Sequence, residues 1–63
     1  MLRFEGEFMD GQRDGKGKEY DENGVLKFEG EYFNGNRWNG KEIEYDQSGF
    51  MKYEIQYLNG KKV

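Results

Sequence analysis

Apolar and polar residues alternate along much of the chain. The clearest stretch is residues 26–32, LKFEGEY, in which every second residue is apolar or glycine and the residues between them are charged. A period of two is typical of a β-strand that turns one face toward a core. Glycine recurs every few residues, and no stripe with the 3.6-residue period of a helix is present. The pattern therefore predicts an all-β chain.

The alternating stretches form an internal repeat. Residues 2–8, LRFEGEF, match residues 26–32 at an offset of 24, and residues 51–57, MKYEIQY, follow at an offset of 25. The glycines that come after each stretch keep the same spacing. The 63 residues are therefore expected to form one module with about two and a half copies of a 24-residue unit. Unit 1 is predicted to cover about residues 2–25, unit 2 about 26–50 and a half unit about 51–63.

Each unit is predicted to form two antiparallel strands. Asp–Gly, Asn–Gly and Ser–Gly pairs, which favour hairpin turns, separate the alternating stretches. Facing residues share a face, so we expect Tyr20 opposite Leu26, with a loop over residues 22–24 in which Gly24 has a positive φ. The predicted fold is all-β, a single-layer antiparallel meander of repeated β-hairpins with about five strands. Its terminal strands are expected over residues 2–8 and 51–58.

This register also predicts the composition of the two faces. Four pairs of opposite charge are expected across neighbouring strands: Glu19–Lys27, Glu44–Lys52, Glu7–Arg13 and Glu31–Arg37. Glu42 is expected to face Glu54, without a compensating partner. The other face is predicted to be apolar and to carry Leu2, Phe4, Phe8, Tyr20, Leu26, Phe28, Tyr32, Ile43, Tyr45, Met51, Tyr53, Ile55 and Tyr57. Because a single-layer sheet must bury one face, either its aromatic side chains fold over its own glycines or another surface covers them.

The composition excludes most enzyme classes. The chain has no His or Cys, and Ser48 is its only Ser, so it lacks a nucleophile–base pair, a zinc site and disulfides. Residues 21–24 lack the ligand spacing of a calcium loop. Glu5 and Glu7 are interpreted as solvated strand surface rather than as a glycosidase pair. We therefore predict no catalytic residues, no metal and no cofactor.

Charge and hydropathy narrow the range of partners. The chain has 10 basic and 13 acidic residues, and this net charge of −3 disfavours nucleic acid and anionic lipid. No apolar run approaches the ~20 residues of a membrane span and no signal peptide is recognisable, so a cytoplasmic location is expected. A domain of ~60 residues without disulfides or metal is marginally stable alone, which favours association with another chain.

Two segments, Phe4–Phe8 (FEGEF) and Phe28–Tyr32 (FEGEY), resemble the Tyr-x-Gly-x-aromatic core of MORN repeats (membrane occupation and recognition nexus). Asp10–Gly11 and Asn34–Gly35 are similar to the turn that follows this core. Residues 20–26 resemble the shorter bacterial variant of the repeat. The resemblance implies an elongated, gently twisted sheet of hairpins that serves as a scaffold or docking surface. Protein interaction, dimerisation and phospholipid binding are all attributed to the family.

The later part of the chain departs from this pattern in three places. Ile55 stands where Gly6 and Gly30 predict a glycine, Glu42 replaces Gly17, and one residue is inserted near Trp38. The insertion suggests a bulge, and Trp38 is interpreted either as a structural plug over Gly30 or as a binding anchor. Gly6 and Gly30 either line a ligand groove or make room for a neighbouring aromatic ring, and the second interpretation is favoured.

The expected function is a non-catalytic MORN-repeat scaffold for protein–protein interaction or self-assembly, with a homodimer as the expected state. One alternative is a membrane-surface tether that binds phospholipid headgroups, and another is a fragment or designed piece of a longer array. The candidate interaction surface consists of nine aromatic residues: Phe4, Phe8, Tyr20, Phe28, Tyr32, Trp38, Tyr45, Tyr53 and Tyr57.

Overall fold

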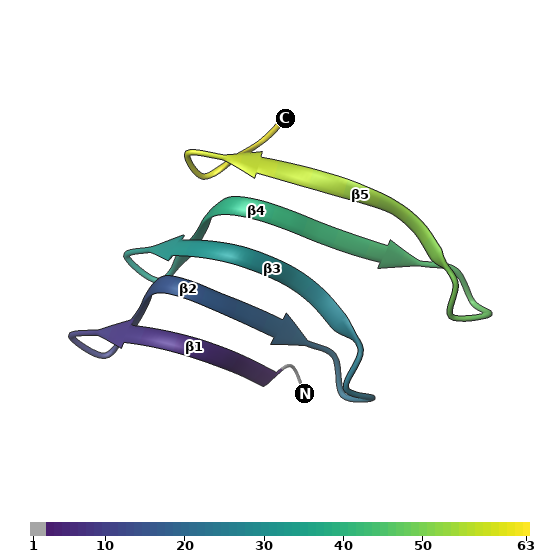
Figure 1. The fold of residues 1–63 in the computed structure, drawn as a ribbon, viewed down its shortest axis with the longest axis horizontal. Coiled ribbons are helices and arrows are strands. Elements are labelled where there is room, and N and C mark those ends of the chain that lie inside the picture. The colour runs from purple at the N-terminus through teal and green to yellow at the C-terminus, as the bar shows by residue number, and fades with distance from the viewer. Residues whose placement is uncertain (1–2) are drawn as a thin grey trace.

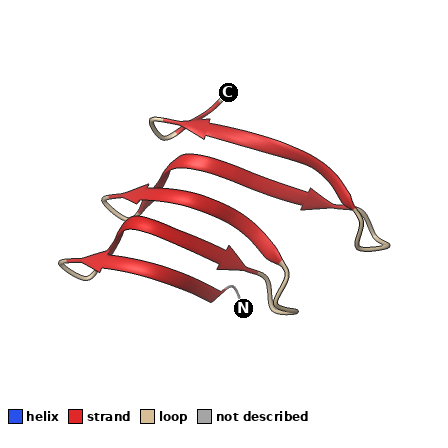
Figure 2. Ribbon diagram, in the orientation of Figure 1, coloured by secondary structure: helices blue, strands red, loops and turns tan. Residues whose placement is uncertain are grey.

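The computed structural model describes residues 3–63, and these form one open antiparallel sheet without any helix. The strands are β1 (Arg3–Met9), β2 (Gln12–Tyr20), β3 (Leu26–Phe33), β4 (Asn36–Tyr45), β5 (Met51–Leu58) and β6 (Lys61–Lys62). They lie side by side in chain order and form a single layer (Figures 1 and 2). The predicted meander is confirmed, with β6 as a short sixth strand. Leu2, predicted on the apolar face, lies outside the described residues.

The long strands bend along their length (Figure 1). The sheet measures 38 × 26 × 13 Å along its principal axes. Three tight turns, at residues 10–11, 34–35 and 59–60, lie at the same end of the sheet. Both residues of each turn have a positive φ, as a two-residue hairpin turn of type I′ requires. Since residues 3–63 contain no helix, none of them forms an apolar helix long enough to cross a membrane.

The opposite end of the sheet carries two longer loops of the same design. In the first loop, Asp21 Oδ1 accepts hydrogen bonds from the backbone N–H groups of Asn23 (2.8 Å) and Val25 (3.0 Å). Tyr20 pairs with Leu26 across this loop and Gly24 has a φ of 82°, so the predicted loop is confirmed. Asp46 repeats the arrangement in the second loop, with bonds from the N–H groups of Ser48 and Phe50.

The register within the hairpins differs from the prediction. The four predicted pairs of opposite charge, Glu19–Lys27, Glu44–Lys52, Glu7–Arg13 and Glu31–Arg37, are wrong. One residue of each predicted pair has an aromatic partner instead: Glu19 pairs with Phe28, Glu44 with Tyr53, Arg13 with Phe8 and Arg37 with Tyr32. The cause is a β-bulge in each of the four pairings from β1 to β5, which leaves residues unpaired and shifts one strand against the other. The bulge expected at Trp38 is confirmed. Arg37 and Asn39 pair with two adjacent residues of β3, Tyr32 and Glu31, so Trp38 between them is the extra residue.

These bulges change which residues share a face. One row across the sheet contains Phe4, Glu19, Phe28, Glu42 and Ile55. The next row on the same face contains Gly6, Gly17, Gly30, Gly40 and Tyr57. We call this face the inner face and the opposite one the outer face. The first of these rows therefore places Glu19 and Glu42 on the inner face, which was predicted to be apolar, and Glu42 faces Ile55 rather than Glu54.

Some aromatic and aliphatic residues predicted on the apolar face lie on the other side of the sheet. Tyr20 pairs with Arg3, the neighbour of Phe4, and Ile43 pairs with Glu54, the neighbour of Ile55. Since consecutive residues of a strand point to opposite faces, Tyr20 and Ile43 lie on the outer face, and the prediction for them is wrong. Tyr45, two residues after Ile43, lies there as well.

The core lies on the inner face, where aromatic rings cover backbone. Phe28 and Tyr32 are buried and their rings meet edge to face, with centroids 5.4 Å apart. A Cβ atom on Gly17 would lie 2.6 Å from atoms of the Phe4 ring and 3.0 Å from the Tyr32 ring. On Gly6 it would meet the backbone of Lys16 and Gly17 at 2.5 and 2.6 Å and the Phe4 ring at 2.8 Å, so this glycine both lets β1 and β2 approach closely and makes room for a ring. Of the two predicted ways to bury the apolar face, the described residues therefore use the first.

At Gly30 the three atoms nearest to a would-be Cβ all belong to backbone. A Cβ atom there would collide with backbone atoms of Asn39 and Gly40, so this glycine allows β3 and β4 to approach closely. Trp38 lies instead against Gly60, where a Cβ atom would be 3.0 Å from its ring. The interpretation of Trp38 as a plug over Gly30 is therefore wrong, and its role as a binding anchor stays a prediction.

Candidate functional site

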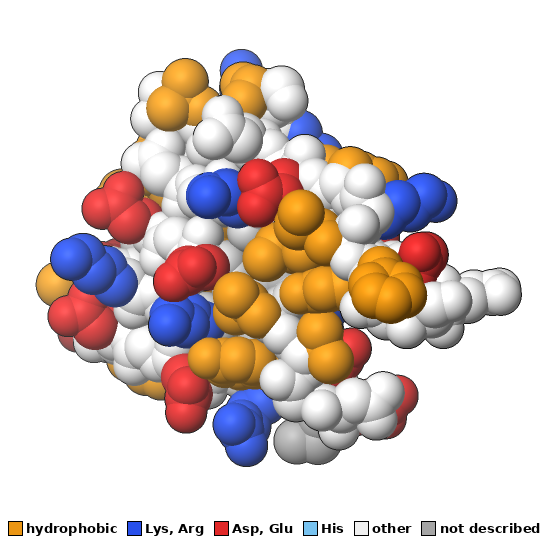
Figure 3. Space-filling view, turned by 45° about the vertical axis from the view of Figure 1, so that its right-hand side comes forward, with side chains coloured by type: hydrophobic (Ala, Val, Ile, Leu, Met, Phe, Trp, Pro, Cys, Tyr) orange, Lys and Arg blue, Asp and Glu red, His pale blue; other side chains and the backbone are white. Residues whose placement is uncertain are grey.

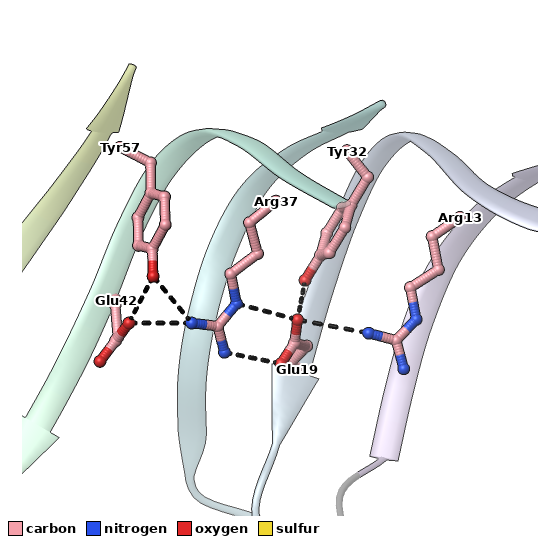
Figure 4. Close-up of polar contacts among 6 residues, drawn as sticks. All are labelled: Arg13, Glu19, Tyr32, Arg37, Glu42 and Tyr57. Carbon is pink, nitrogen blue, oxygen red and sulfur yellow. Dashed lines mark hydrogen bonds and ion pairs between the residues drawn. The ribbon is translucent and has the colours of Figure 1, made fainter. Parts of the chain in front are cut away.

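Six polar side chains cross the inner face of the sheet in one connected chain of hydrogen bonds and ion pairs (Figure 4). We call them the polar chain: Arg13, Glu19, Tyr32, Arg37, Glu42 and Tyr57. Its four charged members alternate in sign from Arg13 to Glu42. The sheet places them together because their strands β2, β3, β4 and β5 are consecutive neighbours. Alternation of charge lets each ion balance the next in a partly buried setting.

Glu19 is the centre of the polar chain. It is only 5% exposed, and its carboxylate accepts bonds from the hydroxyl of Tyr32 (2.8 Å) and from Nε (3.1 Å) and Nη2 (2.7 Å) of Arg37. Nη1 of Arg13 lies 3.3 Å from the same carboxylate. Burial raises the pKa of Glu19, but the hydrogen bonds from Arg37 and Tyr32 and the two positive charges outweigh burial and lower the pKa below its ordinary value. Glu19 is therefore a fixed negative charge near neutral pH.

Arg37 connects the two glutamates. Its Nη1 donates to Glu42 (2.9 Å), and its guanidinium carbon lies 4.7 Å from the centre of the Phe28 ring. The hydrogen bond to Glu19 raises the pKa of Arg37 further above its ordinary value. Burial raises the pKa of Glu42, but the hydrogen bond from the Tyr57 hydroxyl (2.9 Å) and the charge of Arg37 lower it by more.

The chemistry of the polar chain is structural. Burial, together with the hydrogen bond to Glu19, raises the pKa of Tyr32 well above its ordinary value. Tyr32 and Arg37 therefore hold their protons at neutral pH, while Glu19 and Glu42 stay ionised, and no proton is poised for transfer. Among residues 3–63, no three acidic side chains gather closely enough to hold a metal ion. The polar chain thus fixes the strands relative to one another.

A second feature is an exposed row of large apolar side chains at the end of the sheet that carries the three tight turns. We call it the apolar rim, and it consists of the exposed residues Met9, Phe33 and Leu58 together with the half-buried Trp38. Met9, Phe33 and Leu58 are each the last residue before a turn and are between 48% and 61% exposed. Trp38 joins them, because its ring lies 5.0 Å from that of Phe33 and against the turn at Gly60.

Three members of the apolar rim, Met9, Phe33 and Leu58, were not predicted from the sequence. The signal was present, since Met9, Phe33 and Leu58 each follow an aromatic residue and so place two apolar residues in succession. Strict alternation would put a polar residue there. The interruption recurs at offsets of 24 and 25, which matches the repeat.

The nine residues of the candidate interaction surface do not lie together. Phe4, Phe28, Tyr32 and Tyr57 join through edge-to-face ring contacts on the inner face. Phe8 and Tyr53 are exposed, Tyr20 and Tyr45 lie half-buried on the outer face, and Trp38 belongs to the apolar rim. Because Phe28 and Tyr32 are buried within the sheet, they are core residues in the described structure.

The outer face is mostly charged. Glu5, Lys18, Glu29 and Lys41 pair in succession across β1, β2, β3 and β4, so acidic and basic side chains alternate along this row. Figure 3 shows such alternating charges beside a patch of hydrophobic side chains. Nζ of Lys18 lies 3.5 Å from Glu29, and both side chains are about half exposed. Exposed pairs of this kind contribute little stability, so the row chiefly keeps this face soluble.

Comparison with known protein families found two matches. The MORN repeat family matches residues 4–25, which cover β1, β2 and the first long loop. The MORN repeat variant matches residues 38–59, which run from β4 to the end of β5. The two segments together take up more than half of the chain. No curated protein and no solved structure matched the chain.

Proposed function

The chain belongs to the MORN-repeat family, and from this premise we propose that it is a non-catalytic scaffold that binds protein through its apolar rim. MORN repeats are generally non-catalytic, and the polar chain has no group poised for proton transfer. The proposed role is therefore to present a binding surface, and the repeat determines the spacing of the apolar side chains on that surface.

The exposure of the apolar rim is the observation that carries this proposal. Soluble proteins seldom expose several large apolar side chains in one row, and such rows mark interaction sites. Tryptophan is prominent among the residues that dominate binding energy at interfaces, and Trp38 lies within the rim beside Phe33. Because Met9, Phe33 and Leu58 hold equivalent positions in β1, β3 and β5, each repeat adds one contact to the row.

Self-association is the form of this function that can be tested with the chain alone. A homodimer formed rim to rim would cover apolar side chains on both copies through the same patch. The net charge of −3 disfavours the alternative, a tether to anionic phospholipid. We therefore propose a second copy of the chain as the first partner of the rim.

Sedimentation equilibrium from low to high micromolar concentration tests this proposal. The unmodified chain should dimerise, and the double variant Phe33→Ser, Leu58→Ser should remain monomeric. Phe50→Ser is the matched control, because Phe50 is at least as exposed but lies in the loop at the other end of the sheet. A chain that is monomeric throughout, or a double variant that dimerises as well as the control, would exclude the rim as the interface. Flotation with vesicles of phosphatidylserine, lost at high salt, would favour the lipid tether instead.

A further inference from the structure

Arg13 and Arg37 occupy equivalent places in successive repeats. Each follows a tight turn, and each guanidinium lies over the ring of a phenylalanine on the preceding strand, at 4.4 Å for Arg13 over Phe4 and 4.7 Å for Arg37 over Phe28. Each also directs Nη1 toward a glutamate on its own strand, Glu19 for Arg13 and Glu42 for Arg37. The two arginines therefore have the same kind of surroundings at the ring face and at Nη1.

The two arginines differ at the opposite edge of the guanidinium. In Arg37, Nε and Nη2 both donate to Glu19, which reaches from β2 past Phe28 on β3. In Arg13, the same two nitrogens have no acceptor among residues 3–63, and they point away from Glu19 (Figure 4). The side chain of Arg13 is accordingly 36% exposed, compared with 25% for Arg37. The repeat thus leaves a place for one more carboxylate, on the side of Phe4 that faces away from β2.

That place lies beside an open strand edge. β1 is the first strand of the sheet and has only β2 as a neighbour among the described residues. An unpaired edge accepts a further strand through backbone hydrogen bonds. β1 has the same residues as β3 at the two positions that pair with Glu19 and Gly17, since Phe4 and Gly6 correspond to Phe28 and Gly30. A strand that pairs with β1 as β2 pairs with β3 has a glycine opposite Gly6 and a glutamate opposite Phe4.

We propose that the free edge of β1 and the open side of Arg13 together bind an extended strand of a partner polypeptide that carries a Gly-x-Glu sequence. Backbone hydrogen bonds to β1 supply affinity, and the bidentate contact between the glutamate and Arg13 supplies specificity. Gly17–Glu19 of this chain is the internal example of such a sequence, seated on β3 and Arg37. This inference rests on the proposed scaffold function and names the chemistry of a partner at a site separate from the apolar rim.

A peptide with the sequence of residues 12–20, QRDGKGKEY, labelled with fluorescein, tests the proposal by fluorescence anisotropy with the full chain. The peptide should bind, and Glu19→Gln in the peptide alone should weaken binding about tenfold, as expected for the loss of a charged hydrogen bond. Arg13→Gln in the protein should weaken it by a similar factor, and the two changes combined should add little further loss. Arg3→Gln is the matched control, because Arg3 lies on β1 itself but on the outer face, beside Tyr20.

Two further measurements keep the test independent of folding and of the rim. Arg13→Lys keeps the charge but loses the bidentate fork, so it should bind with intermediate affinity, and circular dichroism reports whether each variant is folded. The rim variant Phe33→Ser should bind the peptide normally, so failure of the rim would not be mistaken for failure of this site. Absence of binding up to millimolar protein, or equal binding of the two peptides, would overturn the proposal. Displacement of the peptide by inorganic phosphate at equal concentration would also overturn it, by making Arg13 a general anion site.

Discussion

The inner face is built differently in the two halves of the sheet. Between β2 and β3, Gly17 stands opposite Gly30, and the rings of Phe4 and Tyr32 lie directly on the backbone of Gly17. At an offset of 25 in the sequence, Gly17 and Gly30 correspond to Glu42 and Ile55, which pair between β4 and β5. The second half therefore has side chains at the repeat positions that are glycine in the first half.

The consequence is visible in the aromatic residues at equivalent positions. Phe28 is completely buried, whereas Tyr53, which corresponds to it at an offset of 25, is 47% exposed. Phe28 also has strands on both sides, while β6 is too short to reach the part of β5 that carries Tyr53. The comparison indicates that this repeat buries an aromatic residue when glycines face each other beside it and a further strand flanks it.

The two glutamates of the polar chain show the same contrast. Glu19 lies between two arginines and is 5% exposed, whereas Glu42 lies beyond Arg37 and has that arginine as its one cationic contact in the polar chain. A buried charge that loses its partners is strongly destabilising. The polar chain should therefore be much less tolerant of change at Glu19 than at Glu42.

The largest expected effect is that of Glu19→Gln. This change leaves Arg37 without its bidentate partner and should lower the free energy of unfolding by about 3–5 kcal/mol. Glu42→Gln should lower it by about 1–2 kcal/mol, because the side chain is closer to solvent and the amide still accepts from Tyr57. Since a domain of this size has little stability to lose, we expect Glu19→Gln to be largely unfolded at 25 °C. Circular dichroism at 25 °C without urea reports the unfolded fraction of Glu19→Gln, and urea denaturation measures the loss in Glu42→Gln. Equal stability of the two variants would contradict the comparison.

The next effect in size is that of Gly17→Ala. The new methyl group would lie within 2.6 Å of the Phe4 ring, so the rings must move, and we expect a loss of about 1–3 kcal/mol. Lys18→Ala is the control, because Lys18 is the next residue but points to the outer face, and it should change stability by less than about 0.5 kcal/mol. Thermal melts of the two variants compare them directly. Tolerance of alanine at position 17 would mean that the rings do not depend on the glycine.

The sequence predicted the architecture well because its signals are local. The repeat, the tight turns and the positive φ of Gly24 all follow from short segments whose backbone preferences are known. The polar chain could not be predicted in this way. A bulge moves Glu19 by one residue relative to β3, and this turns a predicted surface charge into the most buried charge of the described residues. The bulge depends on how the strand bends in the sheet, which alternation of residue types does not encode.

A smaller effect is expected on acidification, and it tests the ionised state of Glu19. Its pKa is lower in the folded chain than its ordinary value of 4.5, so the folded state favours the carboxylate. The resulting stability is fully present above pH 4.5 and is lost as the pH falls through the lower folded pKa. Thermal melts from pH 7 downward should therefore show a falling midpoint below about pH 4.5. Glu42→Gln should remain acid-sensitive, because Glu19 is intact, and a midpoint that does not change with pH would contradict the role of Glu19.

The smallest effect is expected for alanine substitutions in the two long loops, where the two halves of the sheet have the same structure. The two long loops have the same hydrogen bonds, and their glycines, Gly24 and Gly49, have φ values of 82° and 88° with no atom within 4 Å of a would-be Cβ. An alanine there meets no steric neighbour and adds only the strain of a left-handed backbone, about 1 kcal/mol. Gly24→Ala and Gly49→Ala should therefore lower stability equally, as measured by urea denaturation. If one loop proves much more sensitive than the other, the difference between the halves extends beyond the inner face, and the facing glycines do not explain it alone.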